Sequence, residues 1–213
     1  LNLTEIAESY LNNSVKNGWE SWGLDASYVY WTDVHFTYGE HAVKGTVDGF
    51  QLPDQCKGNL TTGNKVCKER FIWKFKNGIW SPFELLVNVT IELLEGKNET
   101  FLLNLNNAED ITEPQMLGLN VMKVATTQYQ RCNFSAEVSF KGLFAYKIKE
   151  RRGDVPDYYS VGIGNINVPG VGLVGDGGQT LRYNMSGTFK RVLVCTKQNK
   201  KKKGKKNRKK ANI

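Results

Sequence analysis

The sequence is poor in the residues that carry enzymatic or metal chemistry. It has two histidines, His35 and His41, and four cysteines without a Cys-x-x-Cys pair. Zinc sites and redox motifs need such clusters, and a serine hydrolase needs a Gly-x-Ser-x-Gly turn, which is also missing. No apolar run reaches the roughly 18 residues of a membrane-spanning helix. We therefore expect no enzyme, no cofactor, no metal site and no transmembrane segment.

Acidic residues are absent from residues 197–213, which hold ten basic residues. The whole chain has 29 Lys and Arg residues against 21 Asp and Glu, so the balance without this segment is 19 minus 21, or −2. Like charges repel one another and resist burial, so we expect a disordered tail that attracts polyanions without reading a sequence. Its basic residues are Lys197, Lys200, Lys201, Lys202, Lys203, Lys205, Lys206, Arg208, Lys209 and Lys210.

Glycosylation acceptors are frequent, which indicates a secreted protein. The chain begins at Leu1 without a charged and apolar leader, so we expect a mature, extracellular product whose signal peptide has been removed. A nuclear import signal is the alternative reading of the lysine run, but it does not account for the acceptors. The Asn-x-Ser/Thr acceptors are Asn2, Asn12, Asn59, Asn88, Asn98, Asn133 and Asn184.

An even number of cysteines in a secreted chain predicts two disulfides, formed by Cys56, Cys67, Cys132 and Cys195. Cys132 and Cys195 fall on the apolar faces of expected strands, which favours a buried bridge between them. Cys56 and Cys67 would then close the polar loop CKGNLTTGNKVC. Four cysteines allow three connectivities, so the other pairings stay open.

Period-two alternation of apolar and polar residues dominates after residue 25. It predicts a mainly β (α+β) fold, an antiparallel curved sheet or barrel, over a single domain of residues 1–196. We expect a helix at the N-terminus, capped by Thr4, and one further short helix within 113–127. Asn77-Gly78 predicts a hairpin turn. The expected strands cover residues 26–38, 70–75, 87–93, 101–105, 132–140 and 181–195, with a second hairpin between 93 and 101.

Arg152-Gly153-Asp154 lies between two strand-like stretches, in a segment whose charges, glycine and proline predict an exposed turn. Arg-Gly-Asp is a minimal integrin ligand, and a solvated turn without a partner is the alternative. The spacing Gly170-Val-Gly172-Leu-Val-Gly175 matches a dinucleotide fingerprint. Because Pro169 interrupts it and no helical pattern follows, we expect a mobile loop instead.

The acceptor density, the tryptophan-rich segment NGWESWGLDASYVYW and the tail NKKKKGKKNRKK are shared with a known group of proteins. With these features and its size, the chain resembles the glycosylated salivary immunosuppressant proteins of hard ticks. The resemblance implies a secretion that suppresses T-cell proliferation in the host. It transfers no binding residue to this sequence.

Together these observations predict a secreted, non-enzymatic modulator of host immunity or haemostasis. Its partners would be a host protein or cell-surface receptor and, through the tail, a glycosaminoglycan or other polyanion, with no specific nucleic acid. One alternative is an integrin antagonist that acts through Arg152, Gly153 and Asp154. Another is a β-barrel carrier, in which some of the aromatic residues line a cavity for a small apolar ligand instead of filling the core.

Overall fold

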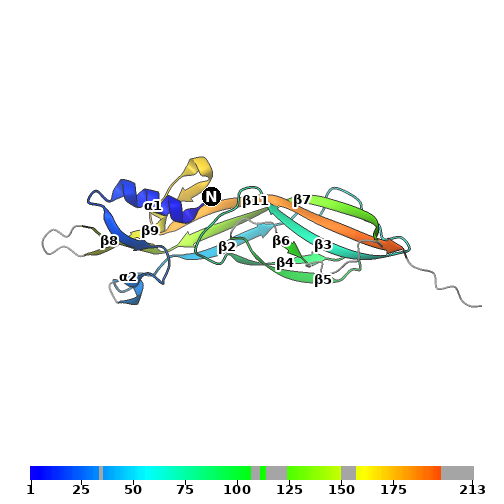
Figure 1. The fold of residues 1–213 in the computed structure, drawn as a ribbon, viewed down its shortest axis with the longest axis horizontal. Coiled ribbons are helices and arrows are strands. Elements are labelled where there is room, and N and C mark those ends of the chain that lie inside the picture. The colour runs from blue at the N-terminus through cyan, green and yellow to red at the C-terminus, as the bar shows by residue number, and fades with distance from the viewer. Residues whose placement is uncertain (34–35, 107–110, 114–123, 150–156, 198–213) are drawn as a thin grey trace, which may run out of the picture.

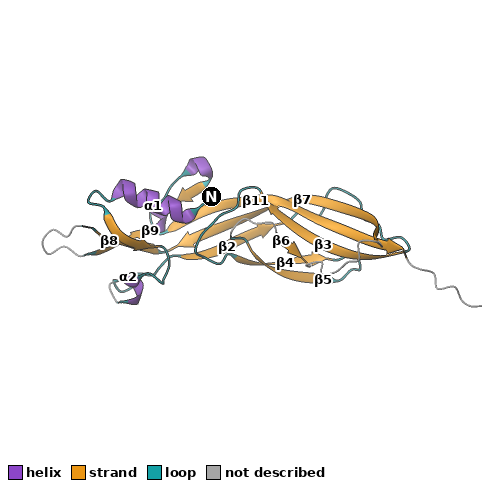
Figure 2. Cartoon of the chain, viewed as in Figure 1, coloured by secondary structure: helices purple, strands orange, loops and turns teal. Residues whose placement is uncertain are grey.

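The computed structural model describes residues 1–33, 36–106, 111–113, 124–149 and 157–197. It is mainly antiparallel β and elongated, with the longest strands along the long axis of the molecule (Figure 1). The helices and the loops around them gather at one end (Figure 2). The mainly β prediction with an N-terminal helix is therefore confirmed.

The largest sheet has the strand order β2–β7–β11–β3–β6, and β10 pairs with β11 beside this path. It curls into a half-barrel whose inner surface is apolar, because alternate residues of each strand point to the same side. Phe134, Val138 and Phe140 of β7 and Tyr183 and Phe189 of β11 are buried there. Its strands are β2 (Lys44–Gln51), β3 (Lys65–Phe75), β6 (Ile111–Glu113), β7 (Val124–Lys141), β10 (Leu173–Gly175) and β11 (Thr180–Lys197).

A separate hairpin, β4 (Leu86–Glu92) and β5 (Asn98–Asn104), packs against the inner surface of this sheet. The ring of Phe101 lies 5.2 Å from that of Phe71 and 5.8 Å from that of Trp73, between centroids. Gly96, with a φ of 76°, supplies the left-handed residue of the turn. The predicted second hairpin is confirmed, and it forms the cover of the core.

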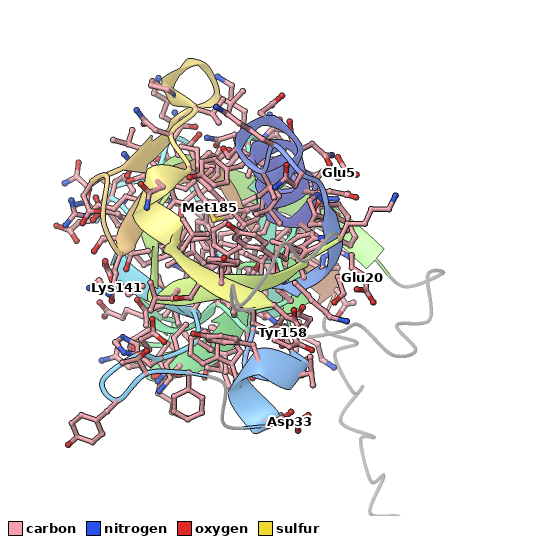
Figure 3. All side chains as sticks on the ribbon, turned by 90° about the vertical axis from the view of Figure 1, so that its left-hand side faces the viewer. Glu5, Glu20, Asp33, Lys141, Tyr158 and Met185 are labelled. Carbon is pink, nitrogen blue, oxygen red and sulfur yellow. A yellow bond between two sulfur atoms is a disulfide. The ribbon has the colours of Figure 1, made fainter. Side chains whose placement is uncertain are left out.

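A smaller sheet of β1 (Trp19–Gly23), β8 (Leu143–Ile148) and β9 (Tyr158–Gly162) forms the head of the molecule. Gly142 separates β7 from β8: its φ is 129°, and a Cβ there would lie 2.7 Å from the carbonyl oxygen of Ala42. Seen along the long axis, Met185 lies in the centre of the molecule, while Glu5, Glu20 and Asp33 lie at its edge (Figure 3).

Helix α1 (Leu3–Ser14) packs on the head through Leu3, Ala7 and Leu11, which recur on one face and are fully buried. Its N-cap is Asn2, whose side-chain oxygen accepts the N–H groups of Thr4 and Glu5. The prediction of Thr4 as the cap was wrong by two positions, because Thr4 already lies inside the helix.

The described residues of the range 26–38 do not form the predicted strand. The chain makes a turn at Asp25, whose carboxylate accepts the N–H and hydroxyl of Ser27, and then enters the short helix α2 (Val29–Thr32). The alternating tyrosines serve packing instead, since the rings of Tyr28 and Tyr30 both contact that of Tyr158 on β9. Alternation of aromatic residues was therefore a misleading signal here.

Asn77-Gly78 does not form the predicted hairpin turn either. The side chain of Asn77 accepts hydrogen bonds from the N–H and hydroxyl of Ser186 and donates one to the carbonyl of Asn184. These bonds hold the segment after β3 against β11. Most of the further helix expected within 113–127 falls on residues 114–123, outside the described residues, and 124–127 belong to β7.

The disulfides join Cys56 to Cys132 and Cys67 to Cys195. The expected pairing of Cys132 with Cys195 was wrong because the strands register differently. Cys132 lies opposite Phe189 of β11, six positions from Cys195, whereas Cys67 of β3 lies directly opposite Cys195. Sharing an apolar face did not bring Cys132 and Cys195 together, because register along the strand also decides contact.

Candidate functional site

The acceptor asparagines of the strands all point into solvent. Asn88 of β4, Asn133 of β7 and Asn184 of β11 are exposed and alternate with buried residues, as the sequence pattern predicts. Asn12, Asn59 and Asn98 are also exposed. Asn2 differs, since it is half-buried and its side-chain oxygen caps α1. Attachment of sugars at these positions stays a prediction.

Two of the predicted sites fall outside the described residues. These are Arg152-Gly153-Asp154 and the tail from residue 198 onward. Lys197, which the sequence placed in the tail, is the last residue of β11 and pairs with Lys65 of β3. The predicted boundary between domain and tail therefore moves by one residue, and β11 ends at the pole of the molecule opposite to the head (Figure 1).

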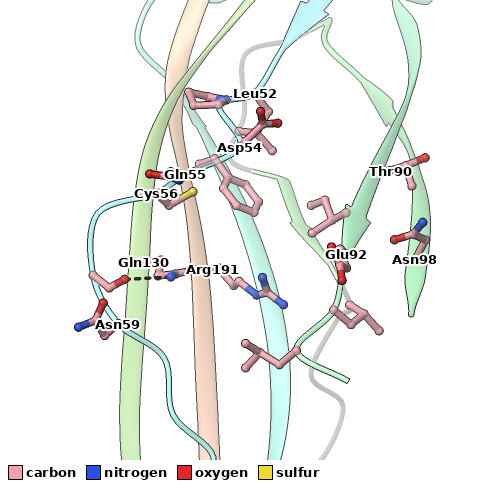
Figure 4. Close-up of a pocket in the computed structure, with 16 residues that line it drawn as sticks. Leu52, Asp54, Gln55, Cys56, Asn59, Thr90, Glu92, Asn98, Gln130 and Arg191 are labelled. Atoms are coloured by element: carbon pink, nitrogen blue, oxygen red, sulfur yellow. Dashed lines mark hydrogen bonds between the residues drawn. The ribbon is translucent and has the colours of Figure 1, made fainter. Parts of the chain in front are cut away.

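An open groove of about 980 Å³ lies on the inner side of the sheet. The loop of residues 52–59 forms one wall, the β4–β5 hairpin forms the other, and β7 and β11 form the floor (Figure 4). Cys56 holds the loop wall in place through its disulfide to Cys132 on β7. Glu69 holds the hairpin wall, since its carboxylate accepts the N–H of Leu94 in the hairpin turn at 2.8 Å.

A largely buried ion pair supports the floor of the groove. Nε of Arg191 donates to a carboxylate oxygen of Glu69 at 2.5 Å, and its Nη2 contacts the same oxygen. The side chains of Arg191 and Glu69 are only 13% and 12% exposed. The guanidinium also lies 5.8 Å above the ring of Phe71. Glu69 thus neutralises Arg191 and at the same time fixes the turn of the hairpin.

The lining of the groove is mixed rather than apolar. Leu52, Ile91 and Phe189 contribute hydrocarbon surface, whereas Asp54 and Glu92 add carboxylates from opposite walls. Because Glu69 already neutralises Arg191, the lining carries an excess of negative charge. Such a groove suits an amphipathic molecule with a hydrocarbon part and polar or cationic groups, and fits a purely apolar one poorly.

The sequence analysis missed Glu69 and Arg191, although the pattern contained a signal for both. Arg191 occupies a position between Phe189 and Leu193 on the apolar face of its strand, and Glu69 does so before Phe71. Charged residues at core positions are rarely unpaired. Two such breaks in the alternation predict a buried pair, but the sequence alone does not tell which strands are neighbours.

Within the described ranges, no group of three or more His, Cys, Asp or Glu side chains is placed to bind a metal ion. His41 is exposed, and His35 lies outside the described residues. The described helices are also too short or too polar to cross a membrane. The glycine segment forms a short 3₁₀ turn at Pro169–Val171 followed by β10, so it lacks the helix of a dinucleotide site.

No protein family model and no curated protein matches this chain. Among solved structures, a chain of the Cry23Aa1 and Cry37Aa1 binary protein complex aligns with a TM-score of 0.45 and 12% identity, over 92% of this chain and 87% of that one. A non-toxic crystal protein from Bacillus thuringiensis gives 0.47 and 12%, over 92% and 94%. The Mpp75Aa1.1 beta-pore-forming protein from Brevibacillus laterosporus gives 0.26 and 13%, over 73% and 65%. With TM-scores below 0.5, these likenesses do not bear on the activity of this chain.

Proposed function

We propose that this protein is a secreted modulator of host immunity or haemostasis. Its lysine-rich end binds extracellular polyanions, above all sulfated glycosaminoglycans, and so retains the protein on them. The observation that carries the proposal is the separation of charge along the chain: ten basic and no acidic residues in 197–213, against a balance of −2 elsewhere. The two disulfides and the exposed acceptor asparagines support an extracellular setting. The choice of immunity or haemostasis rests on the resemblance to tick salivary proteins.

Deleting residues 198–213 tests the attachment. The deletion keeps Lys197, which belongs to β11, and removes nine basic residues. Because polyanion binding by such a segment comes from counterion release, the truncated protein should elute from immobilised heparin at a clearly lower salt concentration than the full chain. A protein with a scrambled tail of the same composition is the matched control and should elute like the full chain. Elution of the truncated protein at the salt concentration of the full chain would contradict the proposal.

A second candidate function is a carrier, and the groove of about 980 Å³ favours it. Its mixed lining changes the expected ligand from an apolar to an amphipathic one. Native mass spectrometry of the glycosidase-treated secreted protein should show an additional bound mass. Asp54→Trp, which would fill the groove from its loop wall, should remove that mass, whereas Asp54→Asn keeps the space and removes only a charge. A wild-type protein without bound mass would rule out a retained ligand.

A further inference from the structure

The outer surface of the large sheet carries a group of cations that the sequence does not reveal. Residues that lie opposite one another on neighbouring strands form rows across the sheet. One row crosses four neighbouring segments and consists of Lys57, Arg131, Lys190 and Ile72. The next row toward the pole contains Tyr129, Val192 and Arg70, and the row after it contains Thr127, Val194 and Lys68. We call this surface the basic face, defined by Lys57, Lys68, Arg70, Tyr129, Arg131 and Lys190.

The charges of the basic face are not compensated within the part of the chain that the structure describes. The outward positions of β3, β7 and β11 in these rows include no Asp or Glu, and Glu69 points to the inner side. None of the five cations makes an ion pair with a described residue. Five positive charges are thus concentrated on one surface of a domain whose balance is −2.

Packing holds several of these cations in position. The ring of Tyr129, which is 52% exposed, lies 4.7 Å from Nζ of Lys190 and 5.1 Å from the guanidinium carbon of Arg131. Val192 and Val194 are buried although they point outward. A cation that is already ordered loses less entropy when it binds an anion.

The position of the basic face within the molecule favours a linear polyanion. Neighbouring strands lie about 4.8 Å apart, so the row of Lys57, Arg131 and Lys190 presents three cations across about 10 Å of backbone. β11 continues from this surface to Lys197, where the tail begins. The acceptors Asn133 and Asn184 lie on the same side of β7 and β11, but only toward the head. Asn133 lies in the row next to Arg131, so sugars there would border the basic face on its head side and would hinder close contact with a flat lipid surface.

We propose that the basic face is itself a binding site for sulfated glycosaminoglycan, in addition to the attachment proposed for residues 198–213. The exposed Arg131 presents planar donors that match sulfate oxygens in pairs. Arg70, whose Nε is buried, and the lysines contribute mainly positive charge. This inference rests on the proposed attachment to polyanions and extends it, because the tail alone is then not the complete site.

The test compares two pairs of substitutions on the same sheet surface. Lys68→Gln/Arg131→Gln removes two exposed charges of the basic face. Lys141→Gln/Arg182→Gln removes two exposed charges near the head, at a site where the carboxylate of Asp48 is close. Hydrogen bonds from Ser139 and then Thr46 keep the pKa of Asp48 below its usual value, so it stays ionised and offsets that pair. Both double variants change the net charge by the same amount.

Heparin affinity is measured for both variants in the full chain and in the chain without residues 198–213, at 0.15 M salt and over a salt series. We expect the variant of the basic face to bind about tenfold more weakly in each background and to show a smaller salt slope. The control variant should stay within about twofold. Because all four residues are exposed, both double variants should fold like the wild type. Their far-UV circular dichroism spectra should therefore match the wild-type spectrum.

The other outcomes separate the inference from the function on which it rests. If tail deletion abolishes binding and the substitutions in the full chain change nothing, the basic face is not a site but the attachment through the tail stands. If both double variants lose heparin affinity equally, the effect comes from net charge alone, and the inference is overturned. If neither deletion nor substitution matters, both proposals fail. Face-dependent binding to vesicles with anionic lipid, without face-dependent heparin binding, would assign the surface to membranes instead.

Discussion

Replacing Cys67 and Cys195 together with alanine is expected to lower the free energy of unfolding by as much as about 5 kcal/mol, the value that loop-closure entropy gives for a bridge across 128 residues. The bridge joins the beginning of β3 to the end of β11, where Cys67 and Cys195 lie directly opposite each other. Domains of this size are stable by only about 5–15 kcal/mol, so the variant should unfold at a much lower urea concentration. Urea denaturation followed by tryptophan fluorescence measures the loss.

The connectivity behind this prediction can be checked on the wild-type protein. Trypsin separates the cysteines into peptides 45–57, 66–68, 132–141 and 192–197. After removal of N-glycans and digestion without reductant, we expect linked pairs of 45–57 with 132–141 and of 66–68 with 192–197. A linked pair of 132–141 with 192–197 would restore the pairing predicted from the sequence. It would also contradict the register of β3, β7 and β11.

The sequence predicted those parts of the fold in which local pattern and burial agree. Along β4, β5, β7 and β11 the alternation of side chains gave the correct faces, and the exposed Asn88, Asn133 and Asn184 fit it. It failed at residues 26–38, where alternate tyrosines pack on Tyr158 from a turn and a short helix. A two-residue period cannot separate a strand from aromatic residues that happen to alternate in an irregular segment.

Long-range register is the information that the sequence did not contain, and both candidate sites depend on it. Lys57, Arg131 and Lys190 are far apart in the chain and become neighbours only because of the strand order β7–β11–β3 and the bridge at Lys57. The charge balance of −2 concealed this cluster, because a sum over the domain does not show where charges gather. The sequence revealed the tail because its charges are contiguous along the chain. For the same reason, the sequence analysis predicted polyanion binding for the tail alone.

Breaking the ion pair under the groove should be the second large effect. Glu69→Ala leaves the largely buried guanidinium of Arg191 without its counter-ion, and it removes the acceptor for the N–H of Leu94. Loss of one partner of a buried pair costs about 3–5 kcal/mol, mostly because the remaining charge stays desolvated. We expect that loss in urea denaturation. Faster hydrogen exchange in residues 86–104 should accompany it, since Glu69 fixes the hairpin turn to β3.

Two controls separate buried charge from lost contacts. Glu20→Ala breaks the pair of Glu20 with Lys147, whose side chains are 54% and 30% exposed, and should cost at most about 1 kcal/mol. Glu69→Leu/Arg191→Leu removes both charges, so it should be much less destabilising than Glu69→Ala. If Glu69→Ala costs no more than Glu20→Ala, Arg191 must remain solvated, and the groove floor would then be open to water. In that case Arg191 would be available to an anionic ligand, and the preference of the groove for cationic groups would have to be abandoned.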